Sequence, residues 1–366
     1  MKQIFSTMIY ENPLPHLYPR NSTMPNVCQL PDGRLMAAHK MGIAFESVDG
    51  TTHLSESLDG GRTWSEPKKV FDKSNEQIPT SDCAKITVLP DGRWILLGYE
   101  FFRADPNLPL GNAKTGGVLD DRVFYSVSED EGKTWSTRTE IPTAWNGHTE
   151  ASAPICVLQN GDLIAPIAGF PAWDGTKTAP DCGRLLRSCD GGKTWNDDTV
   201  CMVFPENRVI CYEQRVCQLE DGTIVVVAWN EDVDGNRLHN HVTFSTDNGK
   251  TFSAPVDTGI QGQASGIMAL DRNRVLTVHA LRRDTDAPGI YACIADVSNQ
   301  QWNPISFERI WAPKELMVKD TKMAEVFSFL KFGQPNVIRL KDGGVLLTFW
   351  FCEQGCYKTL AVKYAL

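Results

Sequence analysis

The chain has 366 residues, of which 42% are hydrophobic and 22% charged, as in an ordinary folded protein. This composition excludes a mainly disordered chain. Its 36 basic and 45 acidic residues give a net charge of −9, and no apolar run approaches the roughly 20 residues that span a bilayer. We therefore expect neither a nucleic acid nor a membrane as a partner.

Residues 1–16 contain one lysine and no sustained apolar stretch, so we expect no signal peptide. The eleven cysteines are scattered, several of them within strand-like runs, which is typical of reduced, buried thiols. Cys352 and Cys356 form the one close pair, and no second pair or histidine cluster accompanies them. We therefore expect a cytoplasmic protein that uses no metal and no cofactor.

A first pattern recurs along the chain: an apolar run that ends in leucine, a turn, and a second apolar run. Five copies carry Asp-Gly or Asn-Gly at the turn, which predicts a β-hairpin because both residues tolerate a positive φ. These copies span 26–38, 85–97, 154–166, 215–227 and 336–348. A sixth copy, 266–278, lacks the glycine. The leucines that anchor the six units are Leu30, Leu89, Leu158, Leu219, Leu270 and Leu340.

A second pattern, Ser-x-Asp-x-Gly-x-Thr-Trp, falls later in each of four units. It spans 57–64, 128–135, 188–195 and 245–252, and a degenerate fifth copy spans 295–302. We expect its aspartate to accept backbone N–H bonds across a turn, and its aromatic ring to fill the space beside the hairpin. The pattern is therefore interpreted as a device that stabilises turns rather than as a site of chemistry.

Six units with two hairpins each predict six four-stranded antiparallel sheets. Such a sheet cannot bury both faces alone, and radial stacking into a propeller solves this problem while protecting the sheet edges. The sixth unit has a hairpin at 336–350 and a third strand at 358–366, and residues 3–10 are β-rich. We therefore predict an all-β, six-bladed propeller that spans 1–366 as a single domain. The N-terminal strand is expected to join the last blade and close the ring.

The four copies of the second pattern, known as aspartate boxes, resemble those of the sialidase superfamily of six-bladed propellers. This resemblance covers essentially the whole chain. It implies an arginine in blade 1 for the substrate carboxylate, a glutamate in blade 4 that activates the nucleophile, and a tyrosine nucleophile in the last blade. Counted back from the anchoring leucines, these places hold Thr23, Glu213 and Gln334. The resemblance thus implies a glycosidase without the standard retaining sialidase mechanism.

Residues before each first strand and after each second strand are expected to meet on one face of the ring. Cleavage of a glycosidic bond generally needs two carboxyl groups, one to donate a proton and one to act as base or nucleophile. The candidate catalytic residues on this face are Glu213, Asp82 and Glu150. The candidate substrate-binding residues are Arg215, His39, Glu100, His148, Trp229, Glu231, His241, Gln334 and Trp350.

We expect a sialidase-like glycoside hydrolase that acts from the end of a carbohydrate substrate on a terminal sugar, acidic sugars included. One alternative is a lyase or hydrolase on uronic-acid or deoxy-sugar oligosaccharides, with a histidine as base. Another is a non-catalytic propeller that binds a glycan. An enzyme would hold Glu213 and Asp82 within about 5–10 Å of each other over a concave pocket.

Overall fold

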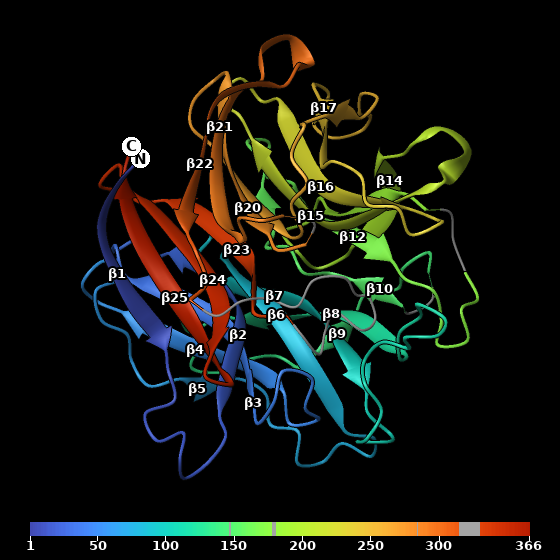
Figure 1. Ribbon diagram of the computed structural model, residues 1–366. Helices are drawn as coiled ribbons and strands as arrows, with labels where there is room; N and C mark the ends of the chain where they lie inside the picture. The colour runs from blue at the N-terminus through green and yellow to red at the C-terminus, as the bar shows by residue number, and fades with distance from the viewer. Residues whose placement is uncertain (146–147, 178–180, 284, 315–329) are drawn as a thin grey trace.

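The computed structural model describes residues 1–145, 148–177, 181–283, 285–314 and 330–366. Six antiparallel sheets surround a common axis, as Figure 1 shows. In the described residues, helix is confined to two 3₁₀ turns, Pro205–Asn207 and Ser298–Gln300. The prediction of an all-β, six-bladed propeller is confirmed. None of the helical segments in the described ranges is long and apolar enough to cross a membrane.

The first three blades follow one another along the chain. Blade 1 contains β2 (Asn21–Gln29), β3 (Leu35–Gly42), β4 (Thr51–Ser57) and β5 (Lys68–Lys69). Blade 2 contains β6 (Thr80–Val88), β7 (Trp94–Phe102), β8 (Asp121–Ser128) and β9 (Thr139–Glu140). In blade 3 the innermost strand is split into two short pieces that both pair with the next strand. These strands are β10 (Thr149–Glu150), β11 (Cys156–Val157), β12 (Leu163–Gly169), β13 (Gly183–Ser188) and β14 (Asn196–Met202).

The last three blades complete the circle. Blade 4 contains β15 (Val209–Gln218), β16 (Ile224–Asp232), β17 (His241–Ser245) and β18 (Val256–Asp257). Blade 5 contains β19 (Ser265–Ala269), β20 (Arg274–Leu281), β21 (Gly289–Asp296) and β22 (Asn303–Trp311). Blade 6 contains β23 (Phe332–Arg339), β24 (Val345–Glu353), β25 (Cys356–Ala365) and, at its outer edge, β1 (Lys2–Tyr10). The two ends of the chain therefore lie side by side in Figure 1, and the predicted closure is confirmed.

The aspartate boxes form the turns between the third and fourth strands of their blades. In the third box, Asp190 accepts hydrogen bonds from the backbone N–H groups of Lys193 and Thr194, and Ser188 Oγ donates to it. The first and fourth boxes repeat all three bonds, and the second repeats those from its serine hydroxyl and its threonine N–H. In the first two, the threonine hydrogen bonds lower the pKa of Asp59 and Asp130 to about 2. The boxes thus act on the turns, as their sequence indicates.

The hydrophobic core lies between the blades. Separate clusters of buried side chains join blades 1 and 2, 2 and 3, 3 and 4, 4 and 5, 5 and 6, and finally 6 and 1. The last of these contains Ile9 of β1 together with Val27 of blade 1 and Leu346 of blade 6. Because every blade is packed on both sides, the inner strands are held in fixed positions around the axis.

Candidate functional site

The innermost strands enclose an axial channel of about 410 Å3, to which all six blades contribute. Three of these strands, β2, β15 and β23, carry a β-bulge near one end of the channel. In each bulge, the residue six places before the anchoring leucine has a positive φ: Met24 at 56°, Glu213 at 40° and Gln334 at 43°. Such a backbone costs a non-glycine residue about 1–3 kcal/mol, and this kind of strain clusters at functional sites. The bulges therefore mark this end of the axis as the candidate site.

Glu213 is held by groups from three blades. Its Oε1 accepts a hydrogen bond of 2.7 Å from Nε2 of Gln334 in blade 6, and its Oε2 accepts one of 2.9 Å from Nε1 of Trp229. Its backbone N–H donates to Oε2 of Glu150 in blade 3, at 3.0 Å. Two N–H donors on a carboxylate favour a fixed orientation of that group. The structure thus brings together Glu213, Gln334, Trp229 and Glu150, four of the residues that the sequence singles out.

Glu150 is the second carboxyl group at this place, and it is almost completely buried. Burial, followed by the nearby charge of Glu213, raises its pKa to about 8. Ser152 Oγ donates to Glu150 Oε1, and Arg215 donates in turn to Ser152 Oγ at 3.1 Å. A carboxyl group with such a pKa carries a proton at neutral pH, which is what a general acid requires.

Three basic side chains surround the two glutamates. Arg215 also donates to the backbone oxygen of Gln214, at 2.8 Å. Arg282 donates to the backbone oxygen of Phe332, and burial lowers its pKa to about 10 although the charge of Glu213 opposes the shift. The third cation is Lys85, on β6, which is 2% exposed. The positive charge here is provided by blades 2, 4 and 5, whereas blade 1 places the buried, uncharged Thr23 at its inner strand.

Two further titratable groups lie near the glutamates. Burial raises the pKa of Tyr99 well above its usual value, and the charges of Glu150, Glu213 and Asp121 add to the shift. Asp121 is also buried, and its pKa is raised although it accepts the backbone N–H of Thr149 at 2.9 Å. The site is therefore rich in acidic groups that share a poorly solvated space.

Asp82 occupies a different environment from the one expected. Its Oδ1 accepts hydrogen bonds from the backbone N–H and Oγ1 of Thr52, and its Oδ2 accepts one from Thr51 and pairs with Lys73 at 2.5 Å. All of these partners come from blade 1 or from the loop that joins it to blade 2. The structure thus gives Asp82 a structural role at the blade interface, and the carboxyl group next to Glu213 is that of Glu150.

Glu100 and His39 are likewise placed inside or between blades rather than at the site. Glu100 is fully buried, and its carboxylate pairs with Arg122 and Arg138 of its own blade. The ring nitrogens of His39 share hydrogen bonds with Ser22 Oγ at 2.8 Å and with Ser55 Oγ at 3.0 Å. Burial lowers the pKa of this imidazole to about 3. Both expectations are corrected here, because these side chains face the neighbouring strands of their own blade.

The other two predicted histidines lie apart from Glu213. His241 begins β17, where its Nδ1 contacts Asn230 Oδ1 at 3.1 Å and its ring meets Phe204 edge-on. His148 has a φ of 57°, and its Nε2 lies 3.7 Å from Asp120. In the described structure neither imidazole contacts Glu150 or Glu213.

The two tryptophans among the predicted substrate-binding residues are buried. Trp229 is 2% exposed and stacks on Tyr212 at a ring distance of 4.3 Å, so its contribution to the site is the hydrogen bond to Glu213. Trp350 is 1% exposed and packs against Phe45 and Tyr357 at 5.1 and 5.7 Å. Other aromatic rings therefore already pack against both indoles.

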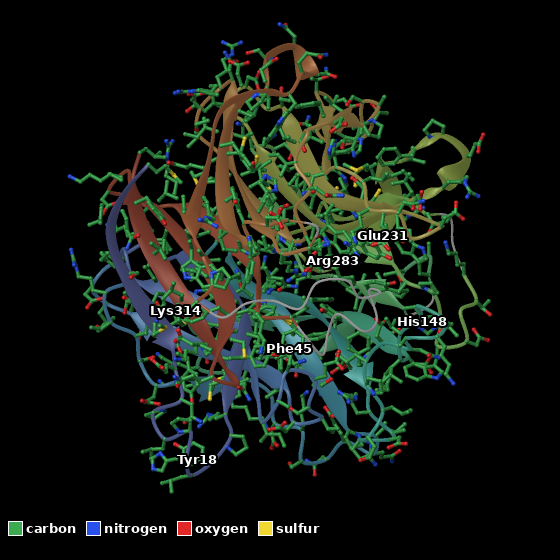
Figure 2. The ribbon with its side chains drawn as sticks, viewed as in Figure 1. Tyr18, Phe45, His148, Glu231, Arg283 and Lys314 are labelled. Carbon is green, nitrogen blue, oxygen red and sulfur yellow. The ribbon has the colours of Figure 1, made fainter. Side chains whose placement is uncertain are left out.

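Glu231, at the end of β16, lies beside Arg283, as Figure 2 shows. Its Oε2 is 3.9 Å from Arg283 Nη1, and both side chains are largely buried. Burial raises the pKa of Glu231, and the charge of Arg283 works against this shift. The carboxylate of this pair comes from blade 4, which also provides Glu213, and the cation follows β20 of blade 5.

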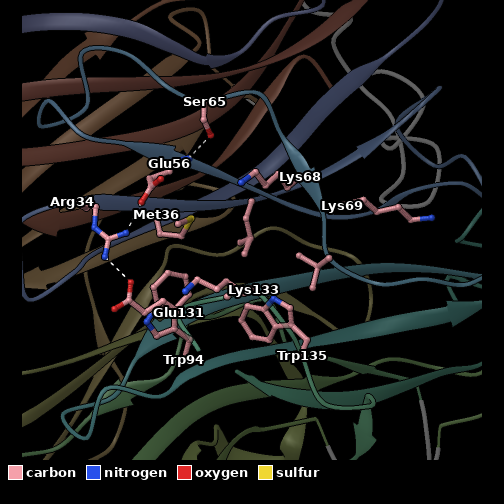
Figure 3. Close-up of a pocket in the computed structure, with 13 residues that line it drawn as sticks. Arg34, Met36, Glu56, Ser65, Lys68, Lys69, Trp94, Glu131, Lys133 and Trp135 are labelled. Carbon is pink, nitrogen blue, oxygen red and sulfur yellow. Dashed lines mark hydrogen bonds and ion pairs between the residues drawn. The ribbon is translucent and has the colours of Figure 1, made fainter. Parts of the chain in front are cut away.

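A second cavity, of about 510 Å3, lies between blades 1 and 2 and is drawn in Figure 3. It is bordered by the first turn of blade 1 and the aspartate box of blade 2, so it is at the opposite end of the blades from Glu213. Its Arg34 donates to Asp32, Glu56 and Glu131 at 2.6–2.8 Å. None of the residues that the sequence predicts as functional lines this cavity.

Sequence reasoning missed Lys85, Ser152 and Asp121 as members of the site. For Lys85 a signal was present, since it lies four residues before the anchoring Leu89, just as Arg215 lies four before Leu219. The register that selects Glu213 and Gln334 therefore also places these two cations at one level of the axis.

Comparison with proteins of known structure supports the fold. An uncharacterised protein from Dyadobacter fermentans is 20% identical, with a TM-score of 0.76, over 99% of this chain and 98% of that one. The NanB sialidase from Streptococcus pneumoniae is 13% identical, with a TM-score of 0.67, over 98% of this chain and 70% of that one. An intramolecular trans-sialidase from Ruminococcus gnavus is 14% identical, with a TM-score of 0.66, over 100% and 98%. At such identities the likeness establishes the sialidase-like propeller fold alone.

No curated protein matches the chain. The family model described as BNR repeat-like domain matches residues 108–305. This match covers more than half of the chain and includes three of the four aspartate boxes. The chain is therefore a member of the family of BNR repeat-like domains.

Proposed function

We propose that the protein is a sialidase-like glycoside hydrolase in which Glu150 and Glu213 act as the carboxyl pair. The observation that carries this proposal is the contact between them at the axis: Glu150 is buried with a pKa of about 8, while Glu213 accepts two N–H donors. Two carboxyl groups whose environments differ in this way are the usual basis for assigning an acid and a base.

In the proposed reaction, Glu150 gives its proton to the oxygen of the glycosidic bond as that bond breaks. Glu213 takes a proton from the water that attacks the anomeric carbon, so the products are the free sugar and the protonated leaving group. Gln334 occupies the place at which the family resemblance implies a tyrosine nucleophile. An amide does not form a glycosyl–enzyme bond, which is why we assign the attack to water.

The substrate is proposed to be a terminal sugar, with acidic sugars as the favoured class. Arg215, Arg282 and Lys85 place three positive charges around the two glutamates. A sugar carboxylate would gain from this field because cations in a poorly solvated site act strongly. These three cations differ in position from the blade-1 arginine that the resemblance implies, so sialic acid is one acidic candidate among several.

The test is a release assay on aryl glycosides of sialic acid, uronic acids and neutral sugars. We expect release from at least one acidic glycoside, and a loss of at least about 100-fold in kcat/KM for both Glu150→Gln and Glu213→Gln. Glu46→Gln provides the matched control. Glu46 is a half-buried residue whose carboxyl pKa is raised by burial, but it contacts Leu110 rather than the axial pair.

Activity that survives in both glutamine variants would exclude the proposed pair. Release from neutral sugars alone would instead remove the preference for acidic substrates and leave the pair in place. A wild-type protein that binds a glycan but releases no sugar would favour the non-catalytic alternative.

A further inference from the structure

Lys85 is a buried cation whose described hydrogen bonds both go to uncharged oxygens. Its Nζ donates to the backbone oxygen of Met24 at 2.6 Å and to Oε1 of Gln334 at 3.3 Å. Burying an ammonium group without a directly paired acid is costly, so such a residue calls for an explanation. Met24 offers its oxygen from within a bulge whose φ is 56°, which means that strained backbone helps to hold the ammonium group.

The side-chain amide of Gln334 connects Lys85 to Glu213. Its Oε1 faces the ammonium group and its Nε2 donates to Glu213 Oε1 at 2.7 Å. If the amide were turned by 180°, its NH2 group would face the ammonium and its oxygen would face the carboxylate, and both contacts would become repulsive. Lys85 therefore determines which end of the amide Gln334 presents to Glu213.

We propose that Lys85 is a positioning residue that acts through the Gln334 amide to keep Glu213 oriented and ionised as the base of the reaction. This inference rests on the proposed function, because a base is needed only if the protein is a hydrolase. The contacts that join Lys85, Gln334 and Glu213 do not depend on any substrate. Where the family resemblance implies a tyrosine, this chain has Gln334, whose amide orients the carboxylate of Glu213. Lys85 supplies the charge that fixes which way this amide faces.

Other charged and titratable groups also face Glu213, and the test must separate them from Lys85. They come from blades 2, 3, 4 and 5 and are Tyr99, Glu150, Arg215 and Arg282. In contrast to the two arginines of this set, Lys85 donates to the side chain of Gln334. A substitution at Lys85 should therefore change the charge near Glu213 and also release the amide.

The indole N–H of Trp229 offers a readout that needs no activity, because it donates to Glu213 Oε2. Its resonance in a 15N-labelled protein, assigned with Trp229→Phe, should shift with pH as Glu213 gains a proton. We expect the midpoint of this titration to rise by roughly 0.5–1 pH unit in Lys85→Met, because a nearby cation favours the ionised carboxylate. Lys85→Arg keeps a charge and N–H donors, so it should return the midpoint toward the wild-type value.

Lys40→Met is the matched control. Lys40 is also a buried lysine, but its Nζ donates to the backbone oxygen of Phe45 at 3.3 Å. Its replacement should leave the Trp229 midpoint unchanged. An unchanged midpoint in folded Lys85→Met, or an equal rise in Lys40→Met, would overturn the proposal.

A double variant tests the path through the amide. In a Gln334→Met background, Lys85→Met should raise the midpoint by at most half of its effect in the wild type, because the amide contact is already gone. An equal effect in both backgrounds would mean that Lys85 acts only through space, and the positioning role would be rejected. If the wild-type protein cleaves no glycoside, the proposed function fails, while the titration still decides the role of Lys85.

Discussion

At the scale of single residues, the carboxyl groups of the two glutamates at the axis have opposite surroundings. Glu150 has its carboxyl group in a space that burial and a neighbouring charge make unfavourable for ionisation. Glu213 has its carboxyl group between two N–H donors, and its backbone N–H is bonded to Glu150. Each group thus contributes to the state of the other, so we expect substitutions at either position to change stability and, in the proposed reaction, activity.

Glu150→Gln should stabilise the protein at alkaline pH. A carboxyl group whose pKa rises from 4.5 to about 8 on folding contributes stability below pH 4.5 and loses it as the pH rises toward 8. Glutamine carries no charge and avoids this loss. We expect the variant to gain on the order of 2–4 kcal/mol over the wild type between pH 5 and pH 8. Urea unfolding of the variant and the wild type at pH 5 and pH 8 measures this gain. A difference in their free energies of unfolding that is the same at the two pH values would contradict the prediction.

Asp82→Asn should have the opposite effect. Although burial alone would raise the pKa of Asp82, the charge of Lys73 and the hydrogen bonds from the threonines lower it below 3.8. Its contribution to stability is therefore present above pH 3.8 and is lost as the pH falls through the lowered pKa. We expect a loss of about 3–5 kcal/mol at pH 7, since Lys73 loses its partner. Thermal melts should show that the difference in stability between Asp82→Asn and the wild type becomes smaller in acid. A difference that grows as the pH falls would refute the pairing of Asp82 with Lys73 as its cause.

At the scale of elements, β-bulges explain which site residues the sequence could predict. The register from the anchoring leucines places Glu213 and Gln334 at the axis, and bulges in β15 and β23 turn both residues there. In contrast, β6 pairs with β7 without interruption from Thr80 to Val88, so Asp82 faces blade 1 instead. A bulge shifts the alternation of side chains by one residue, and nothing in the sequence marks which strands contain one. For the same reason the sequence could not show that the side chains of Glu100 and His39 face the neighbouring strands of their own blades.

The aspartate boxes permit a prediction about turns. In the fourth box, Asp247 accepts backbone N–H bonds from Lys250 and Thr251, whereas Asp296, in the degenerate fifth copy, accepts one from Ser298. Asp247→Ala should therefore lower the Tm by a few degrees, and Asp296→Ala should lower it less. Calorimetry on the two variants measures the difference. Equal decreases would show that the box bonds do not stabilise the turn, and sugar release per folded molecule should remain unchanged in both.

At the scale of the whole molecule, the repeats made the fold predictable because each blade reports the same pattern independently. The number of blades follows from six hairpin signals, and the closure follows from a last unit that lacks one strand. The site was less predictable because it depends on contacts between residues far apart in the chain. Gln334 and Glu213, for example, are 121 residues apart, and Gln334 and Lys85 are 249 apart.

Removal of β1 should open the ring. This strand completes blade 6 and contributes Ile9 to the cluster between blades 6 and 1. A chain without residues 3–10 should leave the edge of β25 unpaired, melt at a lower temperature and associate at micromolar concentration. Size-exclusion chromatography and thermal melts test this. Addition of a peptide with residues 1–12 should reverse the association, and a deletion variant that stays monomeric with an unchanged Tm would contradict the prediction.

The pairing of β1 with β25 also has a consequence for how the protein is made. The strand β1 is synthesised before blades 1 to 5 and its partner β25 after them, so β1 must wait for these five blades before it finds its neighbour. During that interval its backbone groups are exposed to other nascent chains. Translation speed should therefore influence the yield of this protein.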